Sequence, residues 1–229
     1  MKIKFYAHAS FRLEGKDKTV VTDPYEPGVA QFDPIDEPAD LVLKSSDQDR
    51  FHNDASHVRG NPVVVNALTI PEGGASYAGL QVRAFPCRER AKLKLLLVGF
   101  LPRKNAMYAF DLDGVRVLHT GDIGVPFKKK YLDQLRGKVD VMLALSGGVH
   151  NIDPGKLMED IREIKPRMVI PMHYYSPKGR LNILPVEDFM GRFPAGDVFR
   201  PGVSEIEVTP ETLRALAAET TLHVLEQSR

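Results

Sequence analysis

Short apolar segments separated by turns run along the whole chain, and this pattern limits its fold more than any other feature. In the first half the segments alternate apolar and polar residues or form brief apolar runs, which predicts β-strands. Asp23-Pro24 ends one of them, because proline cannot donate a hydrogen bond within a sheet. Asp113-Gly114 predicts a hairpin turn. The predicted strands are residues 3–7, 10–14, 19–22, 39–43, 62–65, 82–85, 106–111 and 115–118.

In the second half, helical segments alternate with apolar strands. Asp153 and Pro154 predict a helix start, with the aspartate as N-cap and the proline at the first helical position, and Pro166 ends that helix. The predicted helices are residues 128–135, 154–165 and 185–193, and the predicted strands are 139–145, 168–172, 205–208 and 222–225, the last two as closing edge strands. The sequence therefore predicts one α/β domain over residues 1–229.

Composition excludes several classes of protein. The 31 Lys and Arg residues nearly balance the 30 Asp and Glu residues, so a nucleic-acid partner is not expected. Cys87 is the one cysteine, which excludes a disulfide framework. No stretch approaches 18 apolar residues and the first residues lack the apolar core of a signal peptide, so we predict a cytoplasmic protein without a membrane partner.

Potential metal ligands stand just past the ends of three apolar strands. Asp47, Asp49 and His52 follow the strand ending at residue 43, Asp122 follows the strand ending at 118, and His173 follows the strand ending at 172. Strand ends are where α/β folds gather ligand-binding groups. A mixture of imidazole and carboxylate suits one divalent zinc, iron or manganese ion, although the same groups could also satisfy one another without metal.

The order of these motifs resembles that of the metallo-β-lactamase superfamily, and especially its small intracellular metal-dependent hydrolases, to which the ascorbate-phosphate lactonases are related. The motifs are His8-Ala9-Ser10-Phe11, Thr22-Asp23-Pro24, Ala39-Asp40-Leu41-Val42, His119-Thr120-Gly121-Asp122 and Ile170-Pro171-Met172-His173-Tyr174. The resemblance implies an αββα sandwich, with two sheets packed face to face, helices outside and the metal site at one edge.

The sequence departs from the family at its metal signature, H-x-H-x-D-H. Ser46 and Gln48 stand where the first two histidines belong, and the mid-chain histidine is absent near Cys87 and Glu89. In the family these three histidines bind one metal ion, and a second set of ligands binds the other. The second set is retained here. Its members are Asp49 (with Asp47 as the alternative motif aspartate), His52, Asp122 and His173.

The resemblance therefore implies a hydrolase of a small ester, lactone or phosphoester that uses metal-bound water at a reduced, single-metal site, with Asp49 and His173 as catalytic groups. The alternative is a catalytically inactive member of the fold with a binding or scaffold role. The expected partner is a small-molecule substrate, and a homo-oligomer is compatible with the apolar residues 93–101, which otherwise form a core strand or a lid. Residues that could support the metal ligands or replace the missing histidines are His8, Asp23, Asp47, Gln48, Cys87 and Glu89.

Overall fold

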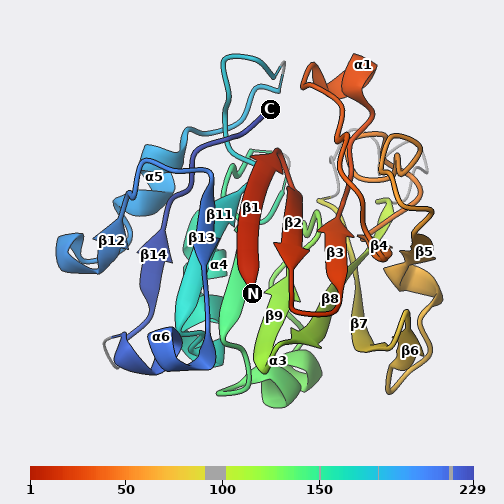
Figure 1. The fold of residues 1–229 in the computed structure, drawn as a ribbon. Helices are drawn as coiled ribbons and strands as arrows, with labels where there is room; N and C mark the ends of the chain where they lie inside the picture. The colour runs from red at the N-terminus through yellow and green to blue at the C-terminus, as the bar shows by residue number, and fades with distance from the viewer. Residues whose placement is uncertain (91–101, 150, 180, 217–218) are drawn as a thin grey trace.

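A computed structural model describes residues 1–90, 102–149, 151–179, 181–216 and 219–229. Two β-sheets lie face to face (Figure 1). The first has the order β13-β1-β2-β3-β4-β5 and the second the order β12-β14-β11-β10-β9-β8-β7-β6. The first sheet contains β1 (Lys2–Ala7), β2 (Ser10–Glu14), β3 (Thr19–Thr22), β4 (Leu41–Lys44), β5 (Val63–Asn66) and β13 (Glu205–Glu207).

The second sheet changes from antiparallel to parallel pairing along its width. The strands β6 to β9 pair antiparallel, whereas β9, β10, β11, β14 and β12 pair parallel. Parallel strands need crossover connections, and α3 and α4 provide two of them. The strands are β6 (Ala75–Tyr77), β7 (Leu80–Arg88), β8 (Lys104–Leu112), β9 (Val115–His119), β10 (Val141–Leu145), β11 (Met168–Met172), β12 (Val198–Phe199) and β14 (Thr221–His223).

Period-two alternation places apolar residues of the first sheet on both of its faces. Leu41 and Leu43 belong to the core between the sheets, whereas Val42 belongs to a second core on the outer face. That outer core is completed by residues between 25 and 58, which include α1 (Pro27–Ala30).

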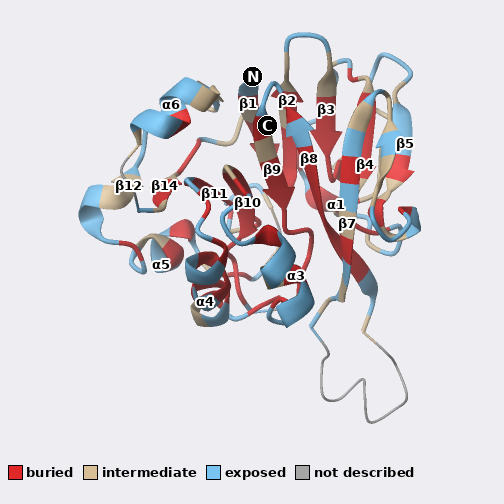
Figure 2. Cartoon of the chain, turned by 90° about the horizontal axis from the view of Figure 1, so that it is seen from below, coloured by how far each residue is buried: buried red, intermediate tan, exposed pale blue. Residues whose placement is uncertain are grey.

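Helices pack outside the second sheet, as Figure 2 shows for α3 (Lys129–Leu135) and α4 (Pro154–Ile164). Asp153 caps α4 by accepting from the N–H groups of Gly155 and Lys156. The remaining helices are α5 (Val186–Met190) and α6 (Pro210–Ala215), with short 3₁₀ turns at Ala67–Thr69 and Ala195–Asp197. The predicted αββα sandwich is confirmed.

Some local predictions were wrong or incomplete. The C-terminal strand predicted at an edge, β14, lies between β11 and β12, because the two-residue strand β12 covers its free side. The short α6 was not predicted. Residues 93–101, predicted as core strand, lid or dimer contact, lie outside the described residues. In the described part of the chain, no helix has the length and apolar character to cross a membrane.

Candidate metal centre

Five loops bring polar side chains to one edge of the sandwich. His8 lies in the two-residue turn between β1 and β2, and His52 lies in the loop after β4. Asp23, Asp122 and His173 follow the ends of β3, β9 and β11. Because β9 and β11 both run parallel to β10, their carboxyl ends lie at the same edge of the second sheet.

The backbone at this edge is held in the left-handed region at several positions. His8, Asp23 and His173 have φ values of 56°, 36° and 55°. Such values are uncommon for residues with side chains and gather at functional sites. Gly121 has a φ of 60°, and a Cβ there would lie 2.5 Å from Asn105 Oδ1 and 2.8 Å from Ala106 O. Only glycine therefore fits directly before Asp122.

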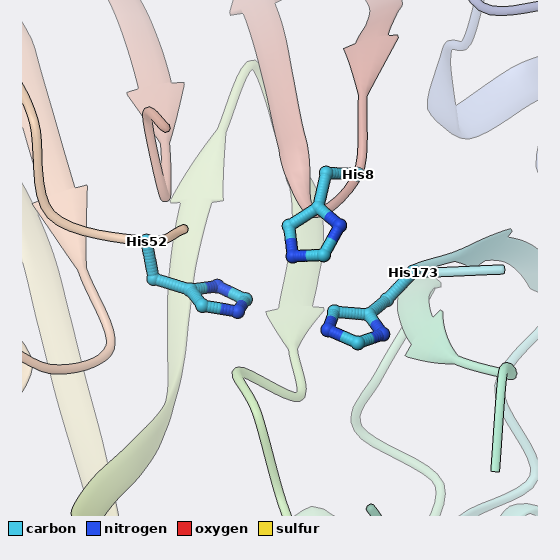
Figure 3. A group of neighbouring side chains, drawn as sticks. All are labelled: His8, His52 and His173. Atoms are coloured by element: carbon cyan, nitrogen blue, oxygen red, sulfur yellow. The ribbon is translucent and has the colours of Figure 1, made fainter. Parts of the chain in front are cut away.

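Three buried imidazoles face one another (Figure 3). The ring centroids of His8 and His173 are 4.0 Å apart, those of His8 and His52 are 5.0 Å apart, and those of His52 and His173 are 5.6 Å apart. Each ring offers a nitrogen that lies within 4.8 Å of the nitrogens of the other two. We refer to His8, His52, Asp122 and His173 as the imidazole cage.

Each histidine of the cage has a buried ring nitrogen that finds no hydrogen-bond partner among the described residues. These atoms are His8 Nε2, His52 Nε2 and His173 Nδ1. A buried polar atom without a partner costs free energy, so His8 Nε2 and His52 Nε2, on rings that face each other, need a common explanation. The nitrogen that His173 presents to Asp122 is Nε2, at 3.9 Å from Oδ1, and not its unpartnered Nδ1. Burial, followed by the neighbouring histidines, lowers the pKa of His8, and it lowers the pKa of His173 to about 3. Both rings are therefore neutral and able to bind a cation at neutral pH.

Asp122 contributes the carboxylate of the cage. Its Oδ2 lies 3.9 Å from His52 Nε2 and its Oδ1 lies 3.9 Å from His173 Nε2, too far for hydrogen bonds. The Asn151 side-chain amide donates to Oδ1, and Asn105 Oδ1 accepts the backbone N–H of Asp122. Burial raises the pKa of the Asp122 carboxyl to about 7. The carboxylate is thus fixed in place with lone pairs left over.

Behind the cage, Asp23 is fully hydrogen-bonded. It accepts from Ser45 N at 2.7 Å, Ser45 Oγ at 2.6 Å and Tyr108 OH at 3.1 Å, and His52 Nδ1 lies 3.0 Å from its Oδ2. Burial alone would raise the pKa of Asp23, but the charges of His119 and His52 and the donors outweigh it and hold the pKa below its usual value. An ionised carboxylate only accepts, so His52 carries its hydrogen on Nδ1 and directs Nε2 into the cage.

The pKa of His52 reflects the same contacts. Burial lowers it, but the hydrogen bond and charge of Asp23, with the charge of Asp122, outweigh burial and raise the pKa to about 9. His119, by contrast, is structural. Its Nε2 lies 2.9 Å from Ala9 O, and its Nδ1 accepts the Gly121 N–H at 3.0 Å, so both nitrogens are used within the fold.

Charged residues gather at another side of the cage. Asp49 belongs to a second ligand group with His52 and Asp122, and its Oδ2 accepts from Arg103 Nη1 at 2.8 Å. Glu89 lies 4.0 Å from Arg103, and its buried Oε1 has no partner among the described residues. Burial, and then the charges of Asp122 and Asp49, raise the pKa of Glu89 to about 8.

The positions that lack the expected histidines have become part of the fold; we refer to Ser46, Gln48, Cys87 and Asn105 as the Ser46 side. Ser46 Oγ donates to Lys104 O at 2.9 Å, and Gln48 Oε1 accepts the Lys104 N–H at 3.0 Å. Cys87 Sγ lies 3.9 Å from Asn105 Oδ1, and burial raises the pKa of this thiol to about 12. A thiol with such a pKa does not supply the thiolate that a metal ion needs.

The structure places the four residues predicted as ligands in two groups that share His52, one of His8, His52 and His173 and one of Asp49, His52 and Asp122. The sequence had placed His8 beside the site. Asp47 points elsewhere, because it pairs with Lys44 at 2.5 Å and with Asn66. Asn105, Tyr108 and Asn151 were not predicted as site residues. Each contacts the site through a side chain whose role depends on tertiary neighbours, so no sequence pattern identified it.

The donor set fits a single divalent ion. Ligand atoms about 2.0–2.2 Å from one ion lie roughly 3–4 Å apart, which is compatible with the separations observed here. Imidazole and carboxylate together suit zinc, iron or manganese. Such an ion would also satisfy the unpartnered Nε2 atoms of His8 and His52.

Residues 2–173 match the family model described as "Beta-lactamase superfamily domain". A UPF0173 metal-dependent hydrolase of Thermococcus onnurineus is 28% identical over 195 residues, which cover 76% of this chain and 84% of that protein. A UPF0173 metal-dependent hydrolase of Archaeoglobus fulgidus is 29% identical over 197 residues, covering 76% and 83%.

Two solved structures have a similar fold. A metallo-β-lactamase-superfamily structure from Thermotoga maritima superimposes with a TM-score of 0.75 at 27% identity, covering 99% of both chains. Igni18, a metallo hydrolase from Ignicoccus hospitalis, superimposes with a TM-score of 0.61 at 17% identity and covers 100% of this chain and 96% of its own. The second likeness concerns the fold alone.

Proposed function

The chain belongs to the β-lactamase superfamily, and on that premise we propose that it is a metal-dependent hydrolase with one divalent ion held by the imidazole cage. The substrate is a small ester, lactone or phosphoester. The observation that carries the proposal is the group of three buried imidazoles, each with a ring nitrogen within 4.8 Å of those of the others, beside the Asp122 carboxylate, whose oxygens lie 3.9 Å from His52 Nε2 and from His173 Nε2. The relatives in Thermococcus and Archaeoglobus, whose names describe metal-dependent hydrolases, support it.

His8, His52, Asp122 and His173 would hold the ion, which is zinc, iron or manganese, with Asp49 at its edge. When bound, such an ion would lower the pKa of water and polarise the carbonyl or phosphoryl group whose carbon or phosphorus is attacked. Asp23 fixes the tautomer and direction of His52, a support that typically changes metal affinity 10–100-fold. Asn151 orients Asp122 through its amide.

Asp49 is the candidate proton acceptor. Its Oδ1 accepts the Phe51 N–H and its Oδ2 accepts from Arg103, so the carboxylate is held beside His52 and Asp122 and still has lone pairs free. His173, the other catalytic group predicted from the sequence, acts in this proposal as a ligand that is neutral at working pH.

The Ser46 side favours one ion over the two of the family signature. Ser46 and Gln48 use their side chains to form hydrogen bonds with the backbone of Lys104. Neither serine nor glutamine replaces an imidazole as a ligand for these ions. The predicted cytoplasmic location and homo-oligomeric state stay predictions.

Metal analysis tests the proposal. Protein purified without chelator or a histidine tag, and supplemented with zinc, iron or manganese, is expected to hold about one ion per chain and to lose ester hydrolysis on chelation. Metal at 100 times its Kd should add about 2.7 kcal/mol to the free energy of unfolding. Less than about 0.2 ion per chain would support the alternative, an inactive member of the fold with a binding role.

A further inference from the structure

Two groups of metal-ligating side chains in the described part of the chain share one residue, His52. The first, which we call the three-histidine group, contains His8, His52 and His173. The second, which we call the carboxylate group, contains Asp49, His52 and Asp122. Within each group, one ligand atom of every residue lies within 4.8 Å of the ligand atoms of the other two. Each group is therefore compact enough to hold a divalent ion.

His52 cannot serve both groups at once. Its Nδ1 lies 3.0 Å from Oδ2 of the ionised Asp23 and carries the ring hydrogen, so Nε2 is the ring nitrogen that keeps a lone pair. This Nε2 is buried, has no partner among the described residues, and lies 3.9 Å from Oδ2 of Asp122. Because one lone pair binds one ion, an ion in the three-histidine group excludes an ion in the carboxylate group.

The two groups differ in the kind of ion that their ligand atoms prefer. The three-histidine group offers three buried imidazoles, whose rings face one another in Figure 3. Imidazole nitrogens suit zinc, which takes four ligands in most protein sites. The carboxylate group offers one imidazole and two carboxylates. Carboxylate oxygens and water suit manganese, which prefers an octahedral shell.

The two groups also differ in their access to water. The side chain of Asp49 is 13% exposed, whereas those of His52 and His173 are 0% and 5% exposed. Asp49 pairs with Arg103, whose side chain is 53% exposed. An ion beside Asp49 could therefore complete an octahedral shell with water, whereas an ion among the three imidazoles would be enclosed by protein.

Resting on the proposed function, we propose that the centre has two alternative positions for its ion, so that zinc is held by the three-histidine group and manganese by the carboxylate group. Asp122 borders both positions, since its Oδ1 lies 3.9 Å from His173 Nε2 and its Oδ2 lies 3.9 Å from His52 Nε2. Asp49 is a ligand only in the manganese position. With zinc bound, Asp49 keeps its lone pairs for the proton transfer of the proposed function.

Two variants separate the positions. His8→Asn removes an imidazole and places asparagine, which tolerates a positive φ, at a residue whose φ is 56°. Asp49→Asn removes a charge and keeps an oxygen to accept the Phe51 N–H. We expect His8→Asn to lower zinc affinity by more than the 10–100-fold typical of a supporting group and to leave manganese affinity within about threefold of the parent. Asp49→Asn should do the reverse.

Competition with a chromophoric chelator measures zinc affinity, and the electron paramagnetic resonance signal of the free ion measures manganese affinity. The matched controls are His223→Asn and Asp47→Asn, at a histidine and an aspartate that belong to neither group. The His223 ring stacks on Phe199, and Asp47 pairs with Lys44. Neither control should change the affinity for either ion. Circular dichroism checks that each variant folds.

The parent protein provides a second test that does not depend on the folding of a variant. X-ray absorption by the zinc-loaded protein should detect three imidazole ligands, and pulsed electron paramagnetic resonance of the manganese-loaded protein should detect one. Since both positions need His52, zinc should displace bound manganese, and the two ions together should not exceed about one per chain.

Each outcome has a separate meaning. Equal losses of zinc and manganese affinity in both His8→Asn and Asp49→Asn would show a single position built from both groups and would overturn the proposal, while the metal-dependent hydrolase would stand. Unchanged zinc affinity in His8→Asn would overturn it too. Simultaneous binding of one zinc and one manganese ion would also overturn it, because His52 would not be shared. If the parent bound neither ion, the proposed function itself would fail.

Discussion

The imidazole cage and the Ser46 side adjoin each other where Asn105 Oδ1 accepts the Asp122 N–H, yet their polar atoms are used in opposite ways. In the cage, His8, His52 and His173 each retain a buried nitrogen without a partner among the described residues. On the Ser46 side, Ser46 and Gln48 bond to both backbone groups of Lys104. A ligand position must leave an atom free, because an atom already bonded within the fold has nothing to offer a metal ion.

Removal of the cage carboxylate should have the largest effect. Asp122→Asn keeps the side-chain volume and one oxygen but loses the charge, so we expect metal affinity to fall by more than the 10–100-fold typical of a supporting group, with hydrolysis lost. A competition titration with a chromophoric chelator measures this affinity. Asp47→Asn is the control, since Asp47 pairs with Lys44 away from the cage. If Asp122→Asn and the parent bound metal with equal affinity, the cage would not differ from the Ser46 side in its ability to bind metal.

A substitution of Asp23 tests whether metal binding by the cage depends on the carboxylate behind His52. Asp23→Asn removes the charge that His52 Nδ1 faces and places an amide among four donors. We expect metal affinity to fall about 10–100-fold, a smaller loss than for Asp122→Asn. Destabilisation of about 1–3 kcal/mol is also expected, because a buried donor loses its acceptor.

A control separates the two effects of Asp23→Asn. Tyr108→Phe removes one donor to the same carboxylate and leaves the contact with His52. It should lower the free energy of unfolding in a urea titration but leave metal affinity within about threefold of the parent. A loss of affinity equal to that of Asp23→Asn would mean that Asp23 acts through general stability rather than through His52.

The Ser46 side should respond in the opposite way. Gln48→Ala removes the acceptor of the Lys104 N–H, so a loss of at most about 0.5 kcal/mol in the free energy of unfolding is expected, since the hydrogen bond is exposed to solvent. Metal affinity should not change. A clear loss of bound metal in Gln48→Ala would show that Gln48 is a ligand. The Ser46 side would then bind metal as the imidazole cage does.

The same contrast explains what could be predicted from the sequence. The resemblance of the motif order to the metallo-β-lactamase superfamily implied the αββα sandwich, and positions just past strand ends made Asp49, His52, Asp122 and His173 the candidate ligands. The orientation of a strand end fixes where such a side chain points. The motif order therefore carried spatial information that composition did not.

The inclusion of His8 could not be predicted in the same way. It lies in a two-residue turn with a φ of 56°, and its ring reaches the cage because the turn meets the end of β11, where the His173 N–H donates to His8 O at 2.6 Å. That contact joins residues far apart in the sequence. Likewise, the uses of Ser46 and Gln48 depend on Lys104 in another sheet. A sequence shows that a ligand is missing, but not which bond has replaced it.

The smallest predicted effect concerns Asp160, a buried carboxylate outside the cage that can be compared with Asp122. It is buried on α4 and accepts the Phe127 N–H at 3.1 Å. Burial raises the pKa of Asp160 to about 6. Since this pKa lies above the unfolded value near 4, the folded state binds the proton more tightly, and the stability from this group is lost as pH rises from about 4 to about 6.

Asp160→Asn keeps an oxygen to accept the Phe127 N–H and removes the charge. With allowance for solvent screening, we expect the variant to be about 1 kcal/mol more stable than the parent at pH 7.5 and no more stable at pH 4.5, as measured by urea unfolding. Metal affinity should be unchanged, because Asp160 is not among the proposed ligands. If the variant were less stable at pH 7.5, the buried charge of Asp160 would be stabilising. A buried carboxylate with few hydrogen-bond donors, such as Asp122, would then no longer be evidence for a cation site.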